Sequence, residues 1–438
     1  MLAYYLRLGL RSLRRNPVLT GLMIMAIGFG VAASMTTFAV FRAVSGNPIP
    51  WKSGQLFVPQ IDGFGPSGRD PGDNGEPPDA LNYQDTMALM RAHPASRQTA
   101  LYPVAISVVP ADAAKQPFSI TGYAVTTDFF SMFEMPFQYG NGWGTNEDDK
   151  RASTVVISSK LNQKMFDGAN SIGRNIVLDN RDYRIVGVAK NWDPHPRYYD
   201  VVNTSGFGDS PDFFMPFSRA IDLQMDTDGN NNCNKSPEGG WDAWLQSTCV
   251  WLTVWVELPD AAAAQHYRSY LDGYAADQKR AGRYNWAPNN RLRNVMEWLD
   301  HEHVVPQETK VSLLVALGFL VVCLVNTIGL LLAKFMRRSQ EIGVRRALGA
   351  SRREIYTQFL AEASMVGVAG GVLGLLLTAG GVFSIGLVFE PEVAELAHVD
   401  FGLIGLTLLV AIGATVIAAF YPTWRAAQVQ PAWQLKSN

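Results

Sequence analysis

The chain has 438 residues, of which 47% are hydrophobic and 17% are charged, and its formal net charge is −2. This length exceeds one ordinary globular core and predicts at least two structural units. The charged fraction lies below the roughly 25% typical of soluble domains, yet the mean hydropathy is only +0.01. We therefore expect a few very apolar segments beside a large polar domain. Lys and Arg cluster beside the apolar segments, which favours a lipid bilayer and argues against nucleic acid as a partner.

Four apolar stretches are long enough to cross a bilayer as helices, which takes about 20 residues each. They predict transmembrane helices over residues 18–44, 311–333, 363–389 and 401–421. The first stretch is too long for the apolar region of a secretory signal, so we expect it to be retained as a helix.

Basic residues flank these stretches on one side only. Arginines precede the first span, Lys and Arg fill residues 334–362, and Arg425 and Lys436 follow the fourth span. The connection 390–400 contains acidic residues but no Lys or Arg. Under the positive-inside rule, both termini and the loop 334–362 are cytoplasmic, whereas residues 45–310 and 390–400 lie outside.

Both ends of the chain are expected to lie in the cytoplasm. Leu2, Leu6, Leu10 and Leu13 recur at helical spacing with arginines elsewhere, which predicts an amphipathic helix over residues 1–17 on the membrane surface. Residues 422–438 form a cytoplasmic tail.

The segment 45–310 is predicted to be a large mixed α+β domain, in two lobes, between the first and second membrane helices. Its composition is rich in Gly, Pro, Asn, Asp and Trp. The predicted strands are 105–109, 154–157, 175–178, 184–188 and 250–257, the predicted helices are 80–92, 261–278 and 292–298, and the predicted long loops are 63–78 and 204–240.

Three cysteines are too few for a disulfide scaffold. Cys323 lies in the second apolar stretch, whereas Cys233 and Cys249 lie in the polar middle of the chain. If that middle lies outside the cytoplasm the two can pair, and the alternative is two free thiols.

Two stretches of the outer domain contain residue types that bind metals. In His301-Glu302-His303 the alternate histidines would share one face of a strand, but a pair without a third ligand is weak support for a metal site. Asp226-Thr227-Asp228-Gly229 is similar to the start of a calcium loop, but Gln224 and Lys235 then occupy positions that need acidic ligands. We therefore predict no metal site, and no motif predicts a catalytic residue.

The loop 334–362 contains a short segment suited to docking on another protein. Ile342, Ala347 and Leu348 give it an apolar side with charges beside them, while Gly349 can end one short helix and Ser351 can cap the next. The predicted docking residues are Glu341, Ile342, Gly343, Arg345, Arg346, Ala347, Leu348 and Gly349. An ordinary basic loop would explain the charge but not the apolar pattern.

The segment Glu341–Ala350, followed by Gln358-Phe359-Leu360 and Glu362, resembles the coupling-helix signature of the MacB/FtsX-type ABC transporter permeases. The glycine-rich third span also resembles the family. So does the outer domain, at residues 125–130, 155–158, 166–168, 172–174 and 183–188. The resemblance implies two groups of helix-packing residues. One is Asn326, which we expect to be buried within the second span. The other is the set Gly367, Gly370, Gly371 and Gly374, whose Gly-x-x-x-Gly spacing allows close contact between helices.

The resemblance implies a non-catalytic membrane subunit in a bacterial inner membrane. Two permease copies, or a copy and a paralogue, would each dock on an ATPase through residues 341–350 and transmit ATP-driven movement to the outer domain for export. A periplasmic adaptor and an outer-membrane channel are further possible partners. ATP and Mg²⁺ would be bound by the ATPase and no cofactor by this chain.

The chain departs from the MacB pattern in one respect, the location of the ATPase. MacB proteins carry it ahead of the first span, whereas here only residues 1–17 precede that span and no Gly-x-x-x-x-Gly-Lys-Ser/Thr loop is present. We expect the ATPase on a separate polypeptide. Two alternatives to export are an FtsX-like signalling module that transmits movement to other proteins and a lipoprotein-release permease. The large outer domain favours the MacB-like interpretation.

Overall fold

The structure is a computed structural model that describes residues 16–66, 68–69, 75–110, 116–204, 206–208, 210–385 and 399–428. The chain divides into two compact units. The membrane unit comprises Met1–Gly46 and Val305–Asn438, and the outer unit comprises Asn47–Val304. The amphipathic helix expected over residues 1–17, most of the connection 390–400 and the end of the tail fall outside the described residues.

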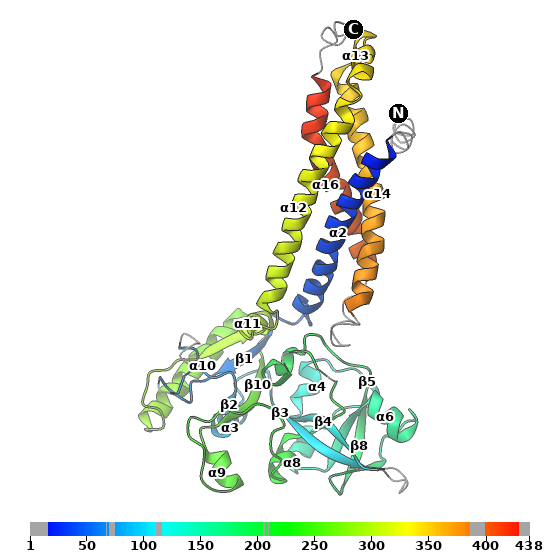
Figure 1. The fold of residues 1–438 in the computed structure, drawn as a ribbon. Helices are drawn as coiled ribbons and strands as arrows, with labels where there is room; N and C mark the ends of the chain where they lie inside the picture. The colour runs from blue at the N-terminus through cyan, green and yellow to red at the C-terminus, as the bar shows by residue number, and fades with distance from the viewer. Residues whose placement is uncertain are drawn as a thin grey trace. The chain divides into compact units, whose positions relative to one another are not determined.

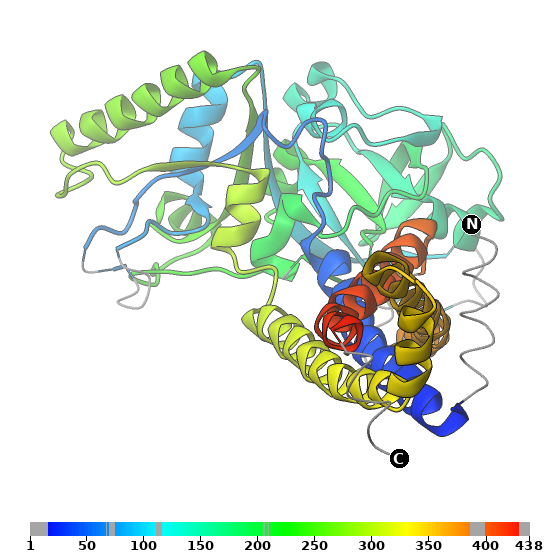
Figure 2. The same ribbon diagram turned by 90° about the horizontal axis from the view of Figure 1, so that it is seen from above.

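The described part of the membrane unit contains four helices that are long and apolar enough to cross a bilayer. These are α2 (Pro17–Ser45), α12 (Gln307–Met336), α14 (Arg352–Ile385) and α16 (Phe401–Ala427), and a short helix, α13 (Ser339–Ala347), connects α12 to α14. Figures 1 and 2 show the four long helices running side by side as one bundle. The four predicted spans are therefore present as helices, except that residues 386–389 of the third lie outside the described residues.

The helices extend beyond the apolar stretches that predicted them. The helix α14 begins at Arg352, although the apolar stretch begins only at residue 363. The predicted loop 334–362 therefore consists of the end of α12, all of α13 and the first turns of α14. Hydropathy marks the part of a helix that lipid can cover, whereas backbone hydrogen bonding continues until a cap or a breaker ends it.

Close helix contact in the membrane unit depends on four buried glycines of α14, Gly367, Gly370, Gly371 and Gly374. A Cβ atom added at Gly370 would lie 2.8 Å from Ile27 of α2, and one at Gly367 would lie 3.0 Å from the backbone of Ile412 on α16. Gly371 likewise faces α16, and Gly374 faces α2. The glycines thus bring both neighbours against α14, as small residues do in membrane bundles.

The outer unit is built on one continuous mixed sheet with the strand order β11-β1-β10-β3-β4-β9-β6-β8-β5. Along this path the strands are β11 (Arg291–Asn294), β1 (Leu56–Gln60), β10 (Val250–Glu257), β3 (Arg97–Val109), β4 (Phe118–Val125), β9 (Phe213–Pro216), β6 (Thr154–Ser158), β8 (Arg181–Ala189) and β5 (Phe137–Gly140). The strand β2 (Leu81–Asn82) pairs with β10, and β7 (Asn175–Leu178) pairs with β3 and β8. The pairs β4–β9 and β6–β8 are parallel.

Helices cover the sheet and fill its connections. They are α3 (Tyr83–Ala92), α4 (Asp128–Met132), α5 (Thr145–Asp149), α6 (Ser159–Phe166), the 3₁₀ turn η2 (Tyr198–Asp200), α7 (Val201–Thr204), α8 (Phe217–Asp222), α9 (Trp241–Gln246), α10 (Ala261–Arg280) and α11 (Val295–His301).

The outer unit has a hydrophobic core on each face of the sheet. Alternate strand residues point to opposite faces, so Phe57 and Tyr102 join one core whereas Leu101 and Trp255 join the other. The second core is strongly aromatic, and many of its rings meet edge to face, as where Phe133 contacts Trp255 at 5.7 Å between centroids, while others stack, as Trp192 does on Tyr199. One sheet with two cores replaces the two lobes expected from the sequence.

All five strands expected in the outer unit are present, within β3, β6, β7, β8 and β10. Two other predicted segments are wrong. The segment 292–298 is not one helix, because β11 occupies its first residues and α11 begins only at Val295. The segment 204–240 is not one long loop, because β9 and α8 lie within it. Four-residue strands such as β9 give too short a pattern to be detected without their neighbours.

Candidate functional site

The end of the short helix α13 and the start of α14 both match the sequence prediction. Gly349 adopts a left-handed conformation with φ of 99°, which favours glycine, directly after the helix. At the start of α14 the Ser351 hydroxyl accepts a hydrogen bond from the Glu354 N–H, and the Glu354 carboxylate accepts one from the Ser351 N–H at 2.8 Å. This capping box begins α14 immediately after the turn, so α13 and α14 are joined by a short, ordered corner.

An ion-pair network, which we call the clamp, fixes α13 to α14. Its centre is Arg338, whose guanidinium donates to both carboxylate oxygens of Glu362 at 2.9 Å and also to Glu341. Arg345 donates to Glu341 at 2.8 Å and to Gln358 at 2.9 Å. Both of these hydrogen bonds come from one guanidinium nitrogen, Arg338 Nη1. Glu362 is only 3% exposed, and hydrogen bonds between charged groups are stronger than neutral ones. The clamp therefore sets the position of α13 relative to the membrane helix α14.

Only part of the predicted docking segment is accessible in this chain. Ile342 and Gly343 are buried, and Ile342 packs in the same core as Phe359, so the expectation that Ile342 belongs to the docking side is wrong. The exposed apolar residues are Val344, Ala347 and Leu348. They recur at i, i+3 and i+4, which places them on one face of α13. We call Val344, Ala347 and Leu348 the docking face.

The docking face combines apolar and basic character. Leu348 is 83% exposed and Val344 is 56% exposed, while Arg345 and Arg346 are partly exposed beside them. A single exposed leucine needs no explanation, but three apolar residues in register on a helix that is clamped from behind present a rigid binding surface. Rigid presentation lowers the entropy cost of binding a partner.

Three residues of the clamp, Arg338, Gln358 and Glu362, were not singled out as site residues from the sequence. Arg338 counted only as a basic flank of the second span, and Glu362 counted only as part of a motif. They are 24 positions apart and meet only because α13 folds back against α14. The sequence did contain a signal for this pair. Glu362 directly precedes the apolar stretch of the third span, and a carboxylate next to apolar surroundings needs a charged or hydrogen-bonding partner.

Asn326 is not buried within the helix bundle of one chain, contrary to the sequence prediction. It lies on the exposed side of α12, and the described residues contain no hydrogen-bond partner for its side chain. The buried side of α12 is instead formed by Ala316, Leu320, Cys323, Thr327 and Leu331. Hydropathy located the helix correctly but could not show which side of it packs.

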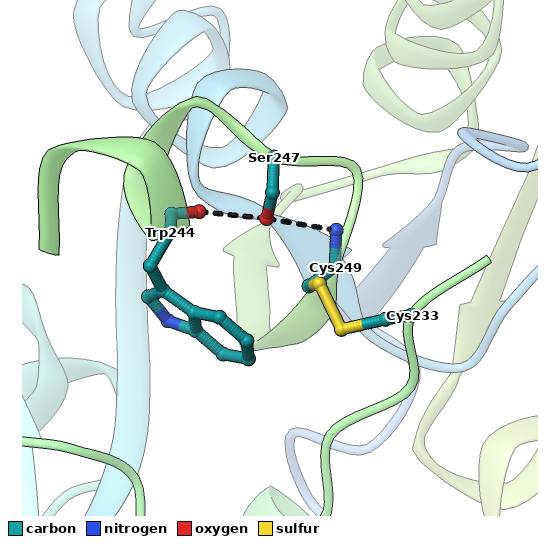
Figure 3. The surroundings of a disulfide bond; sticks show 4 residues. All are labelled: Cys233, Trp244, Ser247 and Cys249. Atoms are coloured by element: carbon teal, nitrogen blue, oxygen red, sulfur yellow. Dashed lines mark hydrogen bonds between the residues drawn. A yellow bond between two sulfur atoms is a disulfide. The ribbon is translucent and has the colours of Figure 1, made fainter. Parts of the chain in front are cut away.

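Cys233 and Cys249 form a disulfide in the outer unit (Figure 3), which decides between the two alternatives left open by the sequence. The bond closes the loop that contains α9 and ties it to the start of β10. Next to it, the Ser247 hydroxyl donates to the Trp244 carbonyl at 2.7 Å and accepts from the Cys249 N–H at 3.1 Å. Disulfides persist in oxidising compartments.

A cavity of about 480 Å³ in the outer unit is lined by Tyr123, Arg197 and Asn203, among others. Behind this lining lies Asp200, which accepts hydrogen bonds from the Tyr123 hydroxyl at 2.7 Å and from the Asn203 amide. Burial raises the pKa of Asp200 to about 6, although these hydrogen bonds and the Arg197 charge act in the opposite direction.

The raised pKa of Asp200 makes the stability of the outer unit depend on pH. Because the folded-state pKa of about 6 exceeds the unfolded value of about 3.9, the folded state holds the proton more tightly. We therefore expect the free energy of unfolding to fall by on the order of 2–3 kcal/mol as pH rises from 4 to above 6. The Asp200→Asn variant should lack this decline in melts followed by tryptophan fluorescence, whereas Asp182→Asn, at an exposed position of β8, should retain it. An unchanged profile in Asp200→Asn would contradict the assignment.

Comparison with known protein families covers both units. The model of the MacB-like periplasmic core domain matches residues 20–273, which is more than half of the chain. The chain belongs to this family. The model of the FtsX-like permease C-terminal domain matches residues 313–431, which include α13 and the clamp. The chain is therefore a MacB/FtsX-type permease, the membrane component of an ABC-type transport system.

The relatives of this MacB/FtsX-type permease include named export proteins. It is 26% identical over 318 residues to the pyoverdine export ATP-binding/permease protein PvdT of Pseudomonas aeruginosa, covering 71% of this chain and 41% of that protein. It is 25% identical over 437 residues to the macrolide export ATP-binding/permease protein MacB of Shigella flexneri, covering 96% of this chain and 58% of that protein. The permease thus spans about half the length of these curated relatives.

Among solved structures, the periplasmic region of MacB from Actinobacillus actinomycetemcomitans matches with a TM-score of 0.36 and 13% identity, covering 57% of this chain and 94% of that one. The extracellular domain of the noncanonic ABC-type transporter YknZ from Gram-positive bacteria matches with a TM-score of 0.33 and 11% identity, covering 55% and 100%.

Proposed function

We propose that this permease couples ATP hydrolysis by a separate ATPase subunit to movement of its outer unit, and that the movement drives export. The observation that carries the proposal is the clamp, which holds a short helix with an outward docking face rigidly on a membrane helix. Force applied to α13 through Val344, Ala347 and Leu348 passes into α14 without bending a flexible loop. From α14 it passes to α2 and α16 through the glycine contacts.

The proposed orientation places α13 and both termini in the cytoplasm of a bacterium and the outer unit in the periplasm. The basic residues that flank the spans support this orientation. The Cys233–Cys249 disulfide supports it independently, because such bonds are rare in the reducing cytosol. In this arrangement the ATPase binds ATP and Mg²⁺ at the inner face of the membrane, and a periplasmic adaptor with an outer-membrane channel would receive the exported molecule.

Export is favoured over two other functions that a permease of this type could have, namely signalling to other proteins and release of lipoproteins. The names of two relatives each specify export, of pyoverdine and of macrolides. The described spans are also apolar along their centres, with no carboxylate or amine of the kind that lines an ion-coupled pathway. Such spans fit a transporter whose outer unit moves the exported molecule better than one that conducts the molecule between its membrane helices.

Affinity purification of the full chain from its native membrane in mild detergent tests the proposal. We expect an ATP-binding protein and its ATPase activity to co-purify with the permease, and the isolated permease to hydrolyse no ATP. Hydrolysis by the isolated chain would contradict the proposed division of labour. A tag at the exposed Ser236 accessible in the same compartment as one at the exposed Arg353 would contradict the orientation.

A second copy or a paralogue is proposed to pack against α12 at Asn326. An amide in the hydrocarbon region favours a hydrogen-bonding partner, which a facing helix can supply at about 1 kcal/mol. The exposed side of α12 around Asn326 includes Val322, Val325 and Gly329, which can pack closely against such a helix.

Cysteine cross-linking tests this pairing. In a Cys323→Ser background, the Asn326→Cys variant should form a disulfide-linked dimer of the permease in oxidised membranes. Leu409→Cys provides the matched control, because Leu409 is 69% exposed but lies on α16. Equal cross-linking at both positions would indicate random collision, and none at Asn326→Cys would argue against a homodimer through this surface.

A further inference from the structure

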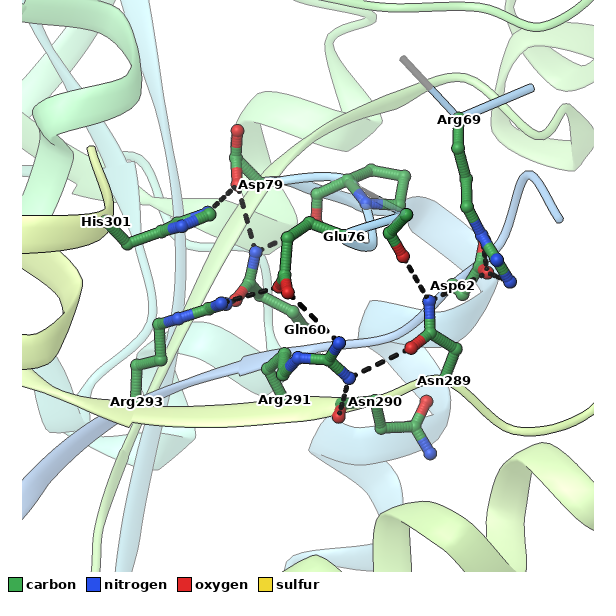
Figure 4. A network of polar contacts seen from close by, with 12 residues as sticks. Gln60, Asp62, Arg69, Glu76, Asp79, Asn289, Asn290, Arg291, Arg293 and His301 are labelled. Carbon is green, nitrogen blue, oxygen red and sulfur yellow. Dashed lines mark hydrogen bonds and ion pairs between the residues drawn. The ribbon is translucent and has the colours of Figure 1, made fainter. Parts of the chain in front are cut away.

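The outer unit contains a cluster of three metal-ligating side chains that lie far apart in sequence. Asp79 precedes β2, His301 is the last residue of α11, and Glu302 follows it. One ligand atom from each of the three lies within 4.8 Å of the others. His301 Nε2 and Asp79 Oδ1 lie 2.9 Å apart (Figure 4).

Neighbouring side chains orient two of these groups. The Gln60 amide donates to Asp79 Oδ1 at 3.0 Å, and the Gln60 carbonyl oxygen accepts in turn from Arg293. The Trp298 ring lies against the His301 imidazole with 5.7 Å between centroids. Such partners are typical of metal sites, where they fix the direction of each ligand.

The charges around the cluster suit a divalent cation. Asp79 and Glu302 together supply two negative charges, and the imidazole supplies a neutral nitrogen. Arg293, in the polar network of Figure 4, is paired with Glu76 at 2.6 Å, and Glu76 also pairs with Arg291 at 3.1 Å. Burial acts to raise the pKa of Glu76, but the two arginines lower it. The Arg293 guanidinium is thus engaged by a carboxylate outside the cluster.

The donor set and its spacing indicate which ions fit. One imidazole nitrogen and two carboxylate oxygens match Zn²⁺, which takes such ligands at about 2.0–2.2 Å and therefore holds them about 3.4 Å apart in a tetrahedron. The observed spread of up to 4.8 Å needs only rotamer adjustments of partly exposed side chains. Asp79 also borders a cavity of about 230 Å³, which leaves room for a water molecule as the fourth ligand. Ca²⁺ and Mg²⁺ prefer oxygen ligands alone.

We propose that Asp79, His301 and Glu302 form a binding site for a divalent transition-metal ion, with Zn²⁺ as the best match. The site differs from the histidine pair considered from the sequence, because the exposed His303 makes its own contact with the Asp300 carbonyl at 2.9 Å and is not part of the cluster. The expectation of no metal site is thereby revised. The third ligand escaped sequence reasoning because Asp79 and His301 are 222 positions apart.

A metal ion at this site would join the segment before β2 to the end of α11. Since Glu302 lies a few residues ahead of Gln307, where α12 begins, the ion would stiffen the part of the outer unit that continues into the second membrane helix. This role is independent of the proposed export function, because it requires only the outer unit to be folded.

A competition titration tests the proposal. The full chain, purified in detergent without a polyhistidine tag, is stripped with EDTA, desalted, and titrated with Zn²⁺ against a chromogenic chelator. We expect one tightly held Zn²⁺ per chain, and at least tenfold weaker binding in Glu302→Gln and in His301→Ala. His303→Ala is the matched control, because it removes a neighbouring imidazole outside the cluster, and it should bind as the unsubstituted chain does.

Two outcomes would overturn the proposal: binding too weak to compete with the chelator, or equal binding by Glu302→Gln and the unsubstituted chain. Glu302→Gln leaves the His301–Asp79 contact in place, so it separates loss of a ligand from loss of folding, which the tryptophan emission reports. Substitution with Co²⁺ gives a second readout. The chain should show the intense visible absorption of four- or five-coordinate Co²⁺, and His301→Ala should lose it; a weak octahedral spectrum would exclude this ligand geometry.

Discussion

Replacing Leu348 by aspartate is expected to abolish binding of the ATPase while leaving the permease folded and inserted. Leu348 is 83% exposed and does not belong to the clamp. The substitution should therefore change the free energy of unfolding of the permease very little. At a docked interface the same carboxylate would be buried in an apolar contact, which is strongly unfavourable. We expect at least a tenfold fall in the ATPase activity that co-purifies with the tagged permease, equivalent to about 1.4 kcal/mol or more.

Thr357→Asp is the matched control for Leu348→Asp. Thr357 is exposed on α14, so this substitution adds the same charge close to α13 in sequence but outside the docking face and the clamp. It should retain the co-purifying activity. If Leu348→Asp also retained it, the docking face would not be the ATPase contact, whereas loss in both variants would indicate a general effect of added charge.

The sequence was most informative where one local property decides the structure. The four membrane helices follow from uncharged stretches, because each must be apolar over the bilayer thickness regardless of its neighbours. The corner between α13 and α14 follows from Gly349 and Ser351 for the same reason, since a left-handed residue and a cap act over a few positions.

Sequence reasoning failed where a side chain's role depends on what packs against it. Ile342 and Leu348 are both apolar residues of one short segment, yet one is buried against the bundle and the other is exposed. Nothing in the local pattern separates them, because which side of α13 faces the bundle is set by the distant pairing of Arg338 with Glu362. Asn326 illustrates the same limit, as its exposure depends on which neighbours α12 contacts.

Breaking the clamp at Glu362 is expected to release α13 from α14. In Glu362→Ala, Arg338 loses the carboxylate that it contacts through two hydrogen bonds in surroundings where little water can replace it. Removing one partner of a buried ion pair typically costs about 3–5 kcal/mol when the other charge stays buried without compensation. Because Arg338 keeps its contact with Glu341, we expect the lower end of this range. Since 3 kcal/mol corresponds to roughly two orders of magnitude in an equilibrium, trypsin should cut after Arg345 and Arg346 about a hundredfold faster.

Glu354→Gln is the matched control for the effect of losing a carboxylate from α14. Glu354 is exposed, and among the described residues its carboxylate accepts hydrogen bonds from Ser351 alone, so its replacement should change the cleavage rate severalfold at most. Unchanged cleavage in Glu362→Ala would show that apolar packing of Ile342 alone holds α13 in place, and the clamp would then have no mechanical role.

A double variant separates two effects of Glu362→Ala, namely the loss of the ion pair and the burial of the Arg338 charge without that partner. Arg338→Met combined with Glu362→Leu removes both charges and keeps apolar volume, a change that is often neutral or stabilising for buried ion pairs. Trypsin resistance should therefore return in the double variant. The ATPase activity that co-purifies should return only in part, because Arg338 also positions Glu341, which in turn holds Arg345 beside the docking face. Full recovery of both would mean that the clamp supplies stability alone and that its geometry does not matter for coupling.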